Sequence, residues 1–121
     1  MTDLSFLTAT ELAPLIKSRQ LSPVELTQHT LDRIEQYDPV LRTYITPLPD
    51  LALKQAKDAE ASIMRGEYKG PLHGIPTGIK DNFFTKGIRT TVGSKLFSNY
   101  VPDKNATTVN KLLKSGVIML G

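Results

Sequence analysis

The sequence predicts an α/β protein: N-terminal helices, then a βαβ unit that belongs to a larger mixed sheet with helices on both faces. Helix-start signals and apolar residues at helical spacing fill residues 1–68. After them, two short apolar segments, 75–80 and 117–120, flank a further helical pattern over 106–115. A strand, a crossover that contains a helix, and a second strand form a right-handed unit with parallel strands. We therefore divide the chain into a helical segment, 1–68, and a βαβ part, 69–121.

The first helix has a recognisable start. Thr8 and Glu11 have the spacing of a capping box, and apolar residues follow at helical positions. Pro14 falls inside this pattern and is better accommodated if the first turn begins at Thr10. We expect the helix to begin between Thr8 and Thr10.

The second helix has the clearer signal. Ser22 is placed as the N-cap, Pro23 takes the first helical position, and Glu25 closes the capping box. The helix is predicted to run to about Tyr37 and to stop before Pro39. Its inward face is predicted to carry three apolar residues: Val24, Leu31 and Ile34.

A third helix is predicted after the stiff connection "TPLPDL", with Asp50 as its cap and Gly66 at its end. Its apolar stripe consists mainly of small residues, which let a helix lie close against its neighbour: Ala52, Ala56, Ala59 and Ile63. We predict that this stripe faces the core.

The second part of the chain contains the two predicted strands. Residues 75–80 are a strand that ends in Lys80, and residues 117–120 are wholly apolar, as in strands buried on both faces of a parallel sheet. Two parallel strands do not make a stable sheet alone. We therefore expect the chain to be part of a larger domain, with strand 117–120 left as an unprotected edge.

Composition limits the function classes. The chain has 121 residues and no cysteine, so disulfides and thiolate chemistry are excluded, and no cofactor or metal site is predicted. No apolar run approaches the roughly 20 residues of a membrane span, and no secretory signal is present, so we expect a cytoplasmic protein without membrane contact. Residues 67–121 carry eight Lys/Arg against three Asp/Glu, but these are scattered singly, which favours a solvated face over a nucleic-acid surface.

The residue types around the end of the first strand point to chemistry. In open α/β sheets, ligands gather at the carboxyl ends of strands, which is where Lys80 lies. A lysine that is partly desolvated there loses its charge more readily and can accept a proton near neutral pH. Asp81 and Asn82 are candidates for capping the following turn and fixing the strand exit. The alternative is a lysine that reaches solvent or pairs with Asp81.

The wider pattern resembles the N-terminal part of amidase signature enzymes. The matching stretches are "GPLHGIPTGIKDNF" (70–83), "GIRTTVGSKLF" (87–97) and "DKNATTVNKLLKSGVIMLG" (103–121). The preceding "ELAPLIKSRQLSPVEL" (11–26) is similar to the first helices of that family. The Lys80 segment is the most specific, because several fixed residue types coincide there in order.

The resemblance implies an enzyme that hydrolyses or transfers an amide with a serine nucleophile, a second serine on a cis peptide bond, and Lys80 as the base. It places both serines in a Gly/Ser-rich stretch downstream of 117–121, which is absent here. Ser94 and Ser98 fall outside the serine motif. We therefore expect a truncated fold, without the serines and the oxyanion-hole loop, that is inactive alone.

The implied partner of the intact enzyme is a small-molecule amide. The resemblance covers general amide hydrolases and the amidase subunit of a tRNA-dependent amidotransferase; only the latter would need tRNA and partner subunits. The alternative function is a non-catalytic module that pairs with itself or with another chain through the exposed strand Val117–Leu120.

Overall fold

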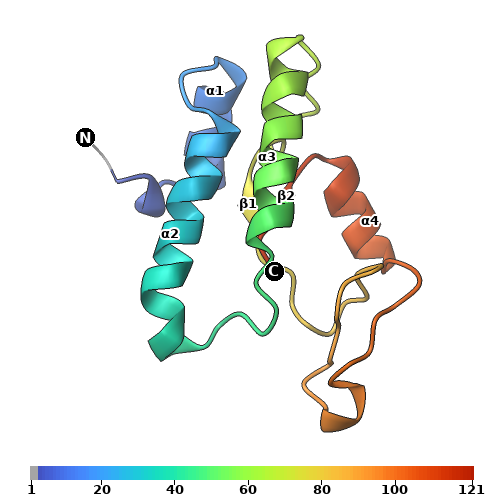
Figure 1. The fold of residues 1–121 in the computed structure, drawn as a ribbon. Helices are drawn as coiled ribbons and strands as arrows, with labels where there is room; N and C mark the ends of the chain where they lie inside the picture. Colours follow the sequence, from blue (N-terminus) through green and yellow to red (C-terminus); the bar gives the residue numbers. More distant parts are fainter. Residues whose placement is uncertain (1–2) are drawn as a thin grey trace.

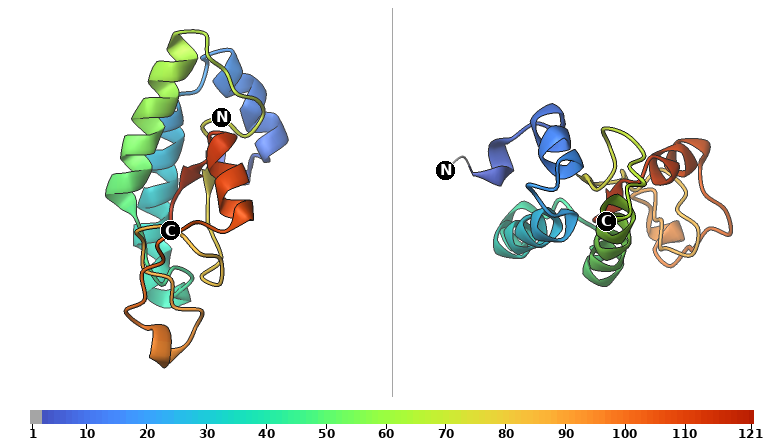
Figure 2. Two further views of the ribbon diagram at one scale, coloured as in Figure 1. Left: turned by 90° about the vertical axis from the view of Figure 1, so that its right-hand side faces the viewer. Right: turned by 90° about the horizontal axis from the view of Figure 1, so that it is seen from above.

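The computed structural model describes residues 3–121, which fold into helices packed around a small parallel sheet (Figure 1). The elements in chain order are η1 (Leu4–Phe6), α1 (Ala9–Lys17), α2 (Pro23–Leu41), α3 (Pro49–Met64), β1 (Pro76–Thr77), η2 (Lys95–Phe97), α4 (Thr107–Lys114) and β2 (Ile118–Met119). Two views agree that α2 and α3 lie on one side of the sheet, and α1 and α4 on the other (Figure 2). In this described part no helix combines the length and the hydropathy needed to cross a membrane.

The two strands pair in parallel, as predicted, with Pro76 opposite Ile118. Regular pairing is shorter than the predicted strand 75–80, since β1 spans two residues and Pro76 has no N–H to give to a ladder. Single hydrogen bonds extend the pairing on both sides. The Ile118 N–H donates to the Ile75 carbonyl at 2.9 Å, and the Ile79 N–H donates to the Gly121 carbonyl at 2.8 Å.

Both predicted N-caps of the first two helices are confirmed. The Thr8 N–H donates to Glu11 Oε2 at 2.7 Å and the Glu11 N–H donates to Thr8 Oγ1 at 3.3 Å, which completes the capping box. The helix begins at Ala9 and continues through Pro14. Ser22 Oγ accepts the first N–H groups of α2 and donates to a carboxylate oxygen of Glu60 at 2.5 Å, so the cap also ties α2 to α3.

The predicted end of the second helix is wrong. Helix α2 continues through Pro39 and ends at Leu41, followed by Arg42 with a φ of 52°. A proline inside a helix removes one backbone hydrogen bond and crowds the carbonyl four residues earlier, and α2 ends two residues after Pro39. The Asp38 carboxylate then accepts the Thr43 N–H at 2.7 Å and the Thr43 hydroxyl, which lowers the pKa of Asp38 and fixes the chain exit.

The predicted cap of α3 is also wrong, whereas its buried stripe is confirmed. Leu48 is the N-cap, and Asp50 lies in the first turn without a capping bond. The Leu48 N–H donates to the Leu120 carbonyl at 2.8 Å, so tertiary contact satisfies the helix start. The buried residues of α3 are those predicted from the sequence: Ala52, Ala56, Ala59 and Ile63. The helix ends before Gly66, whose φ is 86°.

The core consists of two clusters on either side of the helix–sheet contact. One joins α1, α2 and the end of α3 with β1: Leu12, Ile16, Leu21, Leu26, Ile63 and Ile75. The other joins α2 and α3 with β2: Leu31, Ala52, Ala56, Ile118 and Leu120. Because Ala52 and Ala56 are fully buried, α3 lies directly on β2 and on α2.

Strand Val117–Leu120 is buried on both faces, as its apolar sequence predicts, so the strand is not exposed through its side chains. All four of its side chains are buried, none more than 5% exposed. Two backbone groups of the strand are bound by α3 and the residue before it: the Met119 N–H donates to Gln55 Oε1 at 2.8 Å, and the Leu120 carbonyl accepts from Leu48. The strand is therefore covered on both faces, and its backbone is bound at two further points.

Thr27 provides a test of this packing. Its side chain is fully buried in α2, and its hydroxyl has no hydrogen-bond partner among the described residues. Thr27→Val should raise the free energy of unfolding by about 1 kcal/mol, because it removes an unsatisfied buried hydroxyl at nearly constant shape. Thr30→Val is the control, since the Thr30 hydroxyl donates to the Leu26 carbonyl at 2.8 Å. Urea unfolding measures both, and equal effects would contradict the assignment.

Candidate active site

A groove of about 770 Å³ lies at the carboxyl ends of the two strands. Three segments form it: residues 43–48 after α2, residues 78–83 after β1, and the loop 85–93. The end of β2 closes its floor with Met119 and Gly121. Parallel strands end at one edge of the sheet, so the groove lies where ligands bind in open α/β folds.

Lys80 lies in this groove, three residues beyond the end of β1. Its carbonyl accepts the Phe83 N–H at 3.0 Å, so the chain turns directly after it. The side chain is exposed, contrary to the expected partial desolvation. The reason is that the surrounding segments flank the lysine but do not cover it.

Asp81 is bound to the loop on the other side of the groove. Its carboxylate accepts the Thr91 N–H at 3.0 Å, and the Thr91 hydroxyl donates to the same carboxylate. The Asp81 carbonyl accepts the Val92 N–H at 2.9 Å. Asn82 lies beside it in the groove lining and is exposed.

Tyr44 forms one wall of the groove, and two glycines leave the space that it needs. A Cβ on Gly78 would lie 3.2 Å from the Tyr44 hydroxyl, and one on Gly121 would lie 2.8 Å from the ring and from the Thr46 carbonyl. Burial, together with the charge of Asp38, raises the pKa of Tyr44. The wall is therefore a neutral phenol in close contact with both strand ends.

The loop that carries Thr91 is held by buried threonines that the sequence did not single out. Thr85 and Thr90 are buried and share a hydrogen bond of 2.8 Å between their hydroxyls. Arg89 spans the groove wall, because it donates to Thr46 Oγ1 at 3.3 Å and to the Ser98 carbonyl. The adjacent pair Thr90-Thr91 was the available signal in the sequence. A threonine in a loop does not indicate which residues it will hydrogen-bond.

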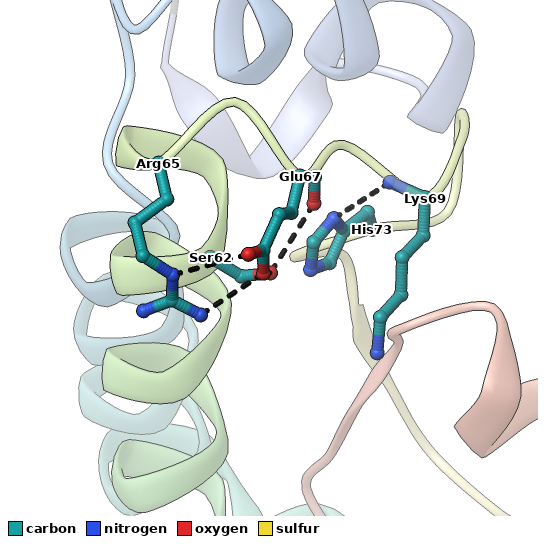
Figure 3. Close-up of polar contacts among 5 residues, drawn as sticks. All are labelled: Ser62, Arg65, Glu67, Lys69 and His73. Carbon is teal, nitrogen blue, oxygen red and sulfur yellow. Dashed lines mark hydrogen bonds and ion pairs between the residues drawn. The ribbon is translucent and has the colours of Figure 1, made fainter.

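His73, by contrast, is a structural residue that precedes β1, at the amino end of the strand (Figure 3). It is 2% exposed and stacks on Tyr68 with ring centres 5.9 Å apart. The Lys69 N–H donates to its Nδ1 at 3.0 Å, next to a separate contact between Arg65 and Glu67 at 3.0 Å. A Cβ on Gly116 would meet the His73 ring at 2.5 Å.

The remaining candidate groups do not form a second site. His29 Nε2 lies 2.7 Å from Ser5 Oγ and 3.3 Å from Asp3 Oδ1, so serine and carboxylate compete for one nitrogen and cannot form a relay. Ser94 caps η2, and Ser98 is bound through its backbone: its N–H donates to the Lys95 carbonyl and its carbonyl accepts from Arg89. Across residues 3–121 no three His, Asp or Glu side chains converge on a point that could hold a metal ion.

Comparison with known proteins agrees with this geometry. The family model described as Amidase matches residues 25–121, and the chain belongs to this amidase signature family. It is 44% identical, over 98% of its length and 24% of the relative's, to a glutamyl-tRNA(Gln) amidotransferase subunit of Carboxydothermus hydrogenoformans.

Solved structures of the family have the same fold. The peptide amidase of Stenotrophomonas maltophilia matches with a TM-score of 0.89 and 34% identity, over 97% of this chain and 24% of that one. Fatty acid amide hydrolase matches with a TM-score of 0.91 and 29% identity, over 97% and 21%. The chain thus spans about a quarter of the length of the curated relatives and structures that it matches.

The burial of His73 predicts a dependence of stability on pH. Desolvation, with a smaller effect of Lys69, lowers the pKa of His73 below its ordinary value of 6.5. The folded state then binds this proton less tightly than the unfolded chain. The stability that neutral His73 contributes should be complete above pH 6.5 and be lost as the pH falls below that value.

Urea unfolding at a series of pH values measures the effect. His73→Asn is the matched variant, because its amide oxygen keeps an acceptor but does not titrate. We expect stability to fall more steeply on acidification in the unmodified protein than in His73→Asn. Parallel curves would show that His73 does not carry the dependence.

Proposed function

We propose that this chain is the N-terminal part of an enzyme that hydrolyses or transfers a carboxamide, with Lys80 as the base of a Ser-cisSer-Lys relay. Two serines and the oxyanion-hole loop would come from a segment outside these 121 residues. Membership of the amidase family supports this proposal. The observation that carries it is the place of Lys80, in a groove at the carboxyl ends of both strands.

The surroundings of Lys80 suit a proton acceptor. Its amine lies in the groove without an ion-pair partner among the described residues, so it is not committed to a structural contact. In the proposed relay, Lys80 takes the proton of the cis serine, which takes the proton of the nucleophile. The further segment would cover the groove and desolvate the lysine, which favours its neutral form.

The substrate would be a small-molecule amide held against the Tyr44 wall. Both a plain amide hydrolase and the amidase subunit of an amidotransferase are compatible with this groove. The relative from Carboxydothermus hydrogenoformans is named for the second activity, which would require tRNA and partner subunits. A cytoplasmic location is part of either proposal. The alternative is a self-pairing module, which would use the backbone edge of strand Val117–Leu120, since its side chains are buried.

The direct test is the protein that continues beyond residue 121, assayed for ammonia release from glutamine, asparagine, aliphatic amides and peptide amides. Lys80→Ala should reduce kcat/KM by about 10²- to 10⁴-fold, the usual contribution of a general base. Lys86→Ala is the control, since Lys86 is an exposed lysine nearby that does not line the groove. Activity of Lys80→Ala within twofold of the unmodified enzyme would refute the proposed role.

The 121-residue chain alone should release ammonia at the background rate, because among residues 3–121 no serine lines the groove with Lys80. The same panel of amides measures this, with heat-denatured chain as the blank. Hydrolysis by the chain that disappears in Lys80→Ala would show instead that a nucleophile lies within residues 1–121.

A further inference from the structure

Lys80 and Asp81 create an electrostatic conflict that the fold resolves. An amine and a carboxylate on consecutive residues attract one another, and an ion pair would hold the lysine in its protonated form. A protonated lysine cannot accept the proton that the proposed function requires. The structure pairs other groups, such as Lys54 with Asp58 at 3.1 Å, but within residues 3–121 no ion pair joins Lys80 to Asp81.

Thr91 occupies the Asp81 carboxylate instead. The Thr91 N–H lies 3.0 Å from one carboxylate oxygen and 3.2 Å from the other, and the hydroxyl donates to the second. Thr91 is 5% exposed, so water has little access to these bonds. The Thr91 oxygen also accepts the Gly93 N–H at 3.2 Å, which fixes the hydroxyl rotor toward Asp81.

The backbone next to Thr91 is in an unfavourable conformation. Val92 has a φ of 54°, a region that β-branched residues rarely enter, and Gly93 follows with a φ of 67°. The Val92 N–H donates to the Asp81 carbonyl at 2.9 Å. The N–H groups of Thr91 and Val92 are therefore both bound to Asp81. Such outliers persist where the surrounding contacts impose them, and they cluster at functional sites.

We propose that Thr91 is a positioning residue that holds the Asp81 carboxylate away from the Lys80 amine and so keeps the lysine available as a base. This proposal rests on the proposed function, since it concerns the same lysine. Thr91 acts through Asp81 and does not touch the reacting atoms. The turn at Val92 and Gly93, which lines the groove, is held in place by the same bonds.

The other charged and titratable groups around Lys80 do not replace Asp81. The segment after α2 contributes Tyr44, a neutral phenol, and the loop contributes Arg89, which is a cation. Asp81 is the one carboxylate side chain among the described residues that line the groove. A change in the position of this carboxylate should therefore change the pH dependence of the reaction that uses Lys80.

The test is the pH profile of kcat/KM for ammonia release by the protein that continues beyond residue 121. Thr91→Val removes the hydroxyl bond and leaves the Asp81 carboxylate held by the backbone N–H alone, so the ascending limb should move to higher pH by up to roughly one unit. Thr91→Ser keeps the hydroxyl and should leave the limb in place. A uniform loss at every pH, which reduced folding alone would give, overturns the proposal.

A second substitution identifies the source of the shift. Adding Asp81→Asn to Thr91→Val should return the limb to its original pH, because an amide does not stabilise the ammonium form. A limb that stays shifted in the double variant overturns the proposal. If Thr91→Val does not fold, as judged by circular dichroism, the single variant Asp81→Asn is measured instead. The ascending limb of its pH profile should not move to higher pH, and a shift to higher pH overturns the proposal.

The design separates this inference from the proposed function. Full activity of Lys80→Ala means that the proposed function fails and, with it, the inference. An inactive Lys80→Ala together with an unshifted Thr91→Val means that the base is correctly assigned and that only the role of Thr91 is wrong.

Discussion

The close approach of α3 to β2 is the contact on which the rest of the structure depends. It requires small side chains on the facing stripe of the helix, and Ala52 and Ala56 are both fully buried there. At that distance the helix and the residue that precedes it bind two polar groups of the strand. The Met119 N–H reaches Gln55, and the Leu120 carbonyl reaches the Leu48 N–H. A larger side chain at Ala56 would separate the layers and leave these groups without partners.

The same contact positions the groove. Once β2 is fixed against α3 and paired with β1, the strands end together, and the chain leaves β1 toward Lys80 beside Gly121. The segment after α2 must pass across these ends on its way to α3. It can do so because Gly78 and Gly121 leave room for Tyr44. Backbone pairing, glycine positions and the aromatic wall thus follow from one packing constraint.

What could be predicted from the sequence was local. The caps at Thr8 and Ser22 and the alanine stripe of α3 depend on residues within a turn or two, and the structure confirms them. The end of α2 and the start of α3 could not be predicted, because Pro39 is tolerated in a last turn and Leu48 is satisfied by a carbonyl 72 positions away. The place of Lys80 at the strand ends was predictable from topology, but its exposure and the Asp81–Thr91 contact depend on tertiary structure.

The loop from residue 85 to 93 shows how a site is built when its central residue is not buried. Lys80 receives no shielding from the described residues, yet its neighbours are tightly held: Thr85 and Thr90 bind each other, and Thr91 binds Asp81. These bonds do not involve the lysine itself, because they join buried threonines to each other and to the Asp81 carboxylate. Order of this kind is what a groove needs if a further layer of the protein is to meet it in one geometry. The chemistry that we propose for Lys80 therefore depends less on the contacts of the lysine than on the threonines that fix the loop beside it.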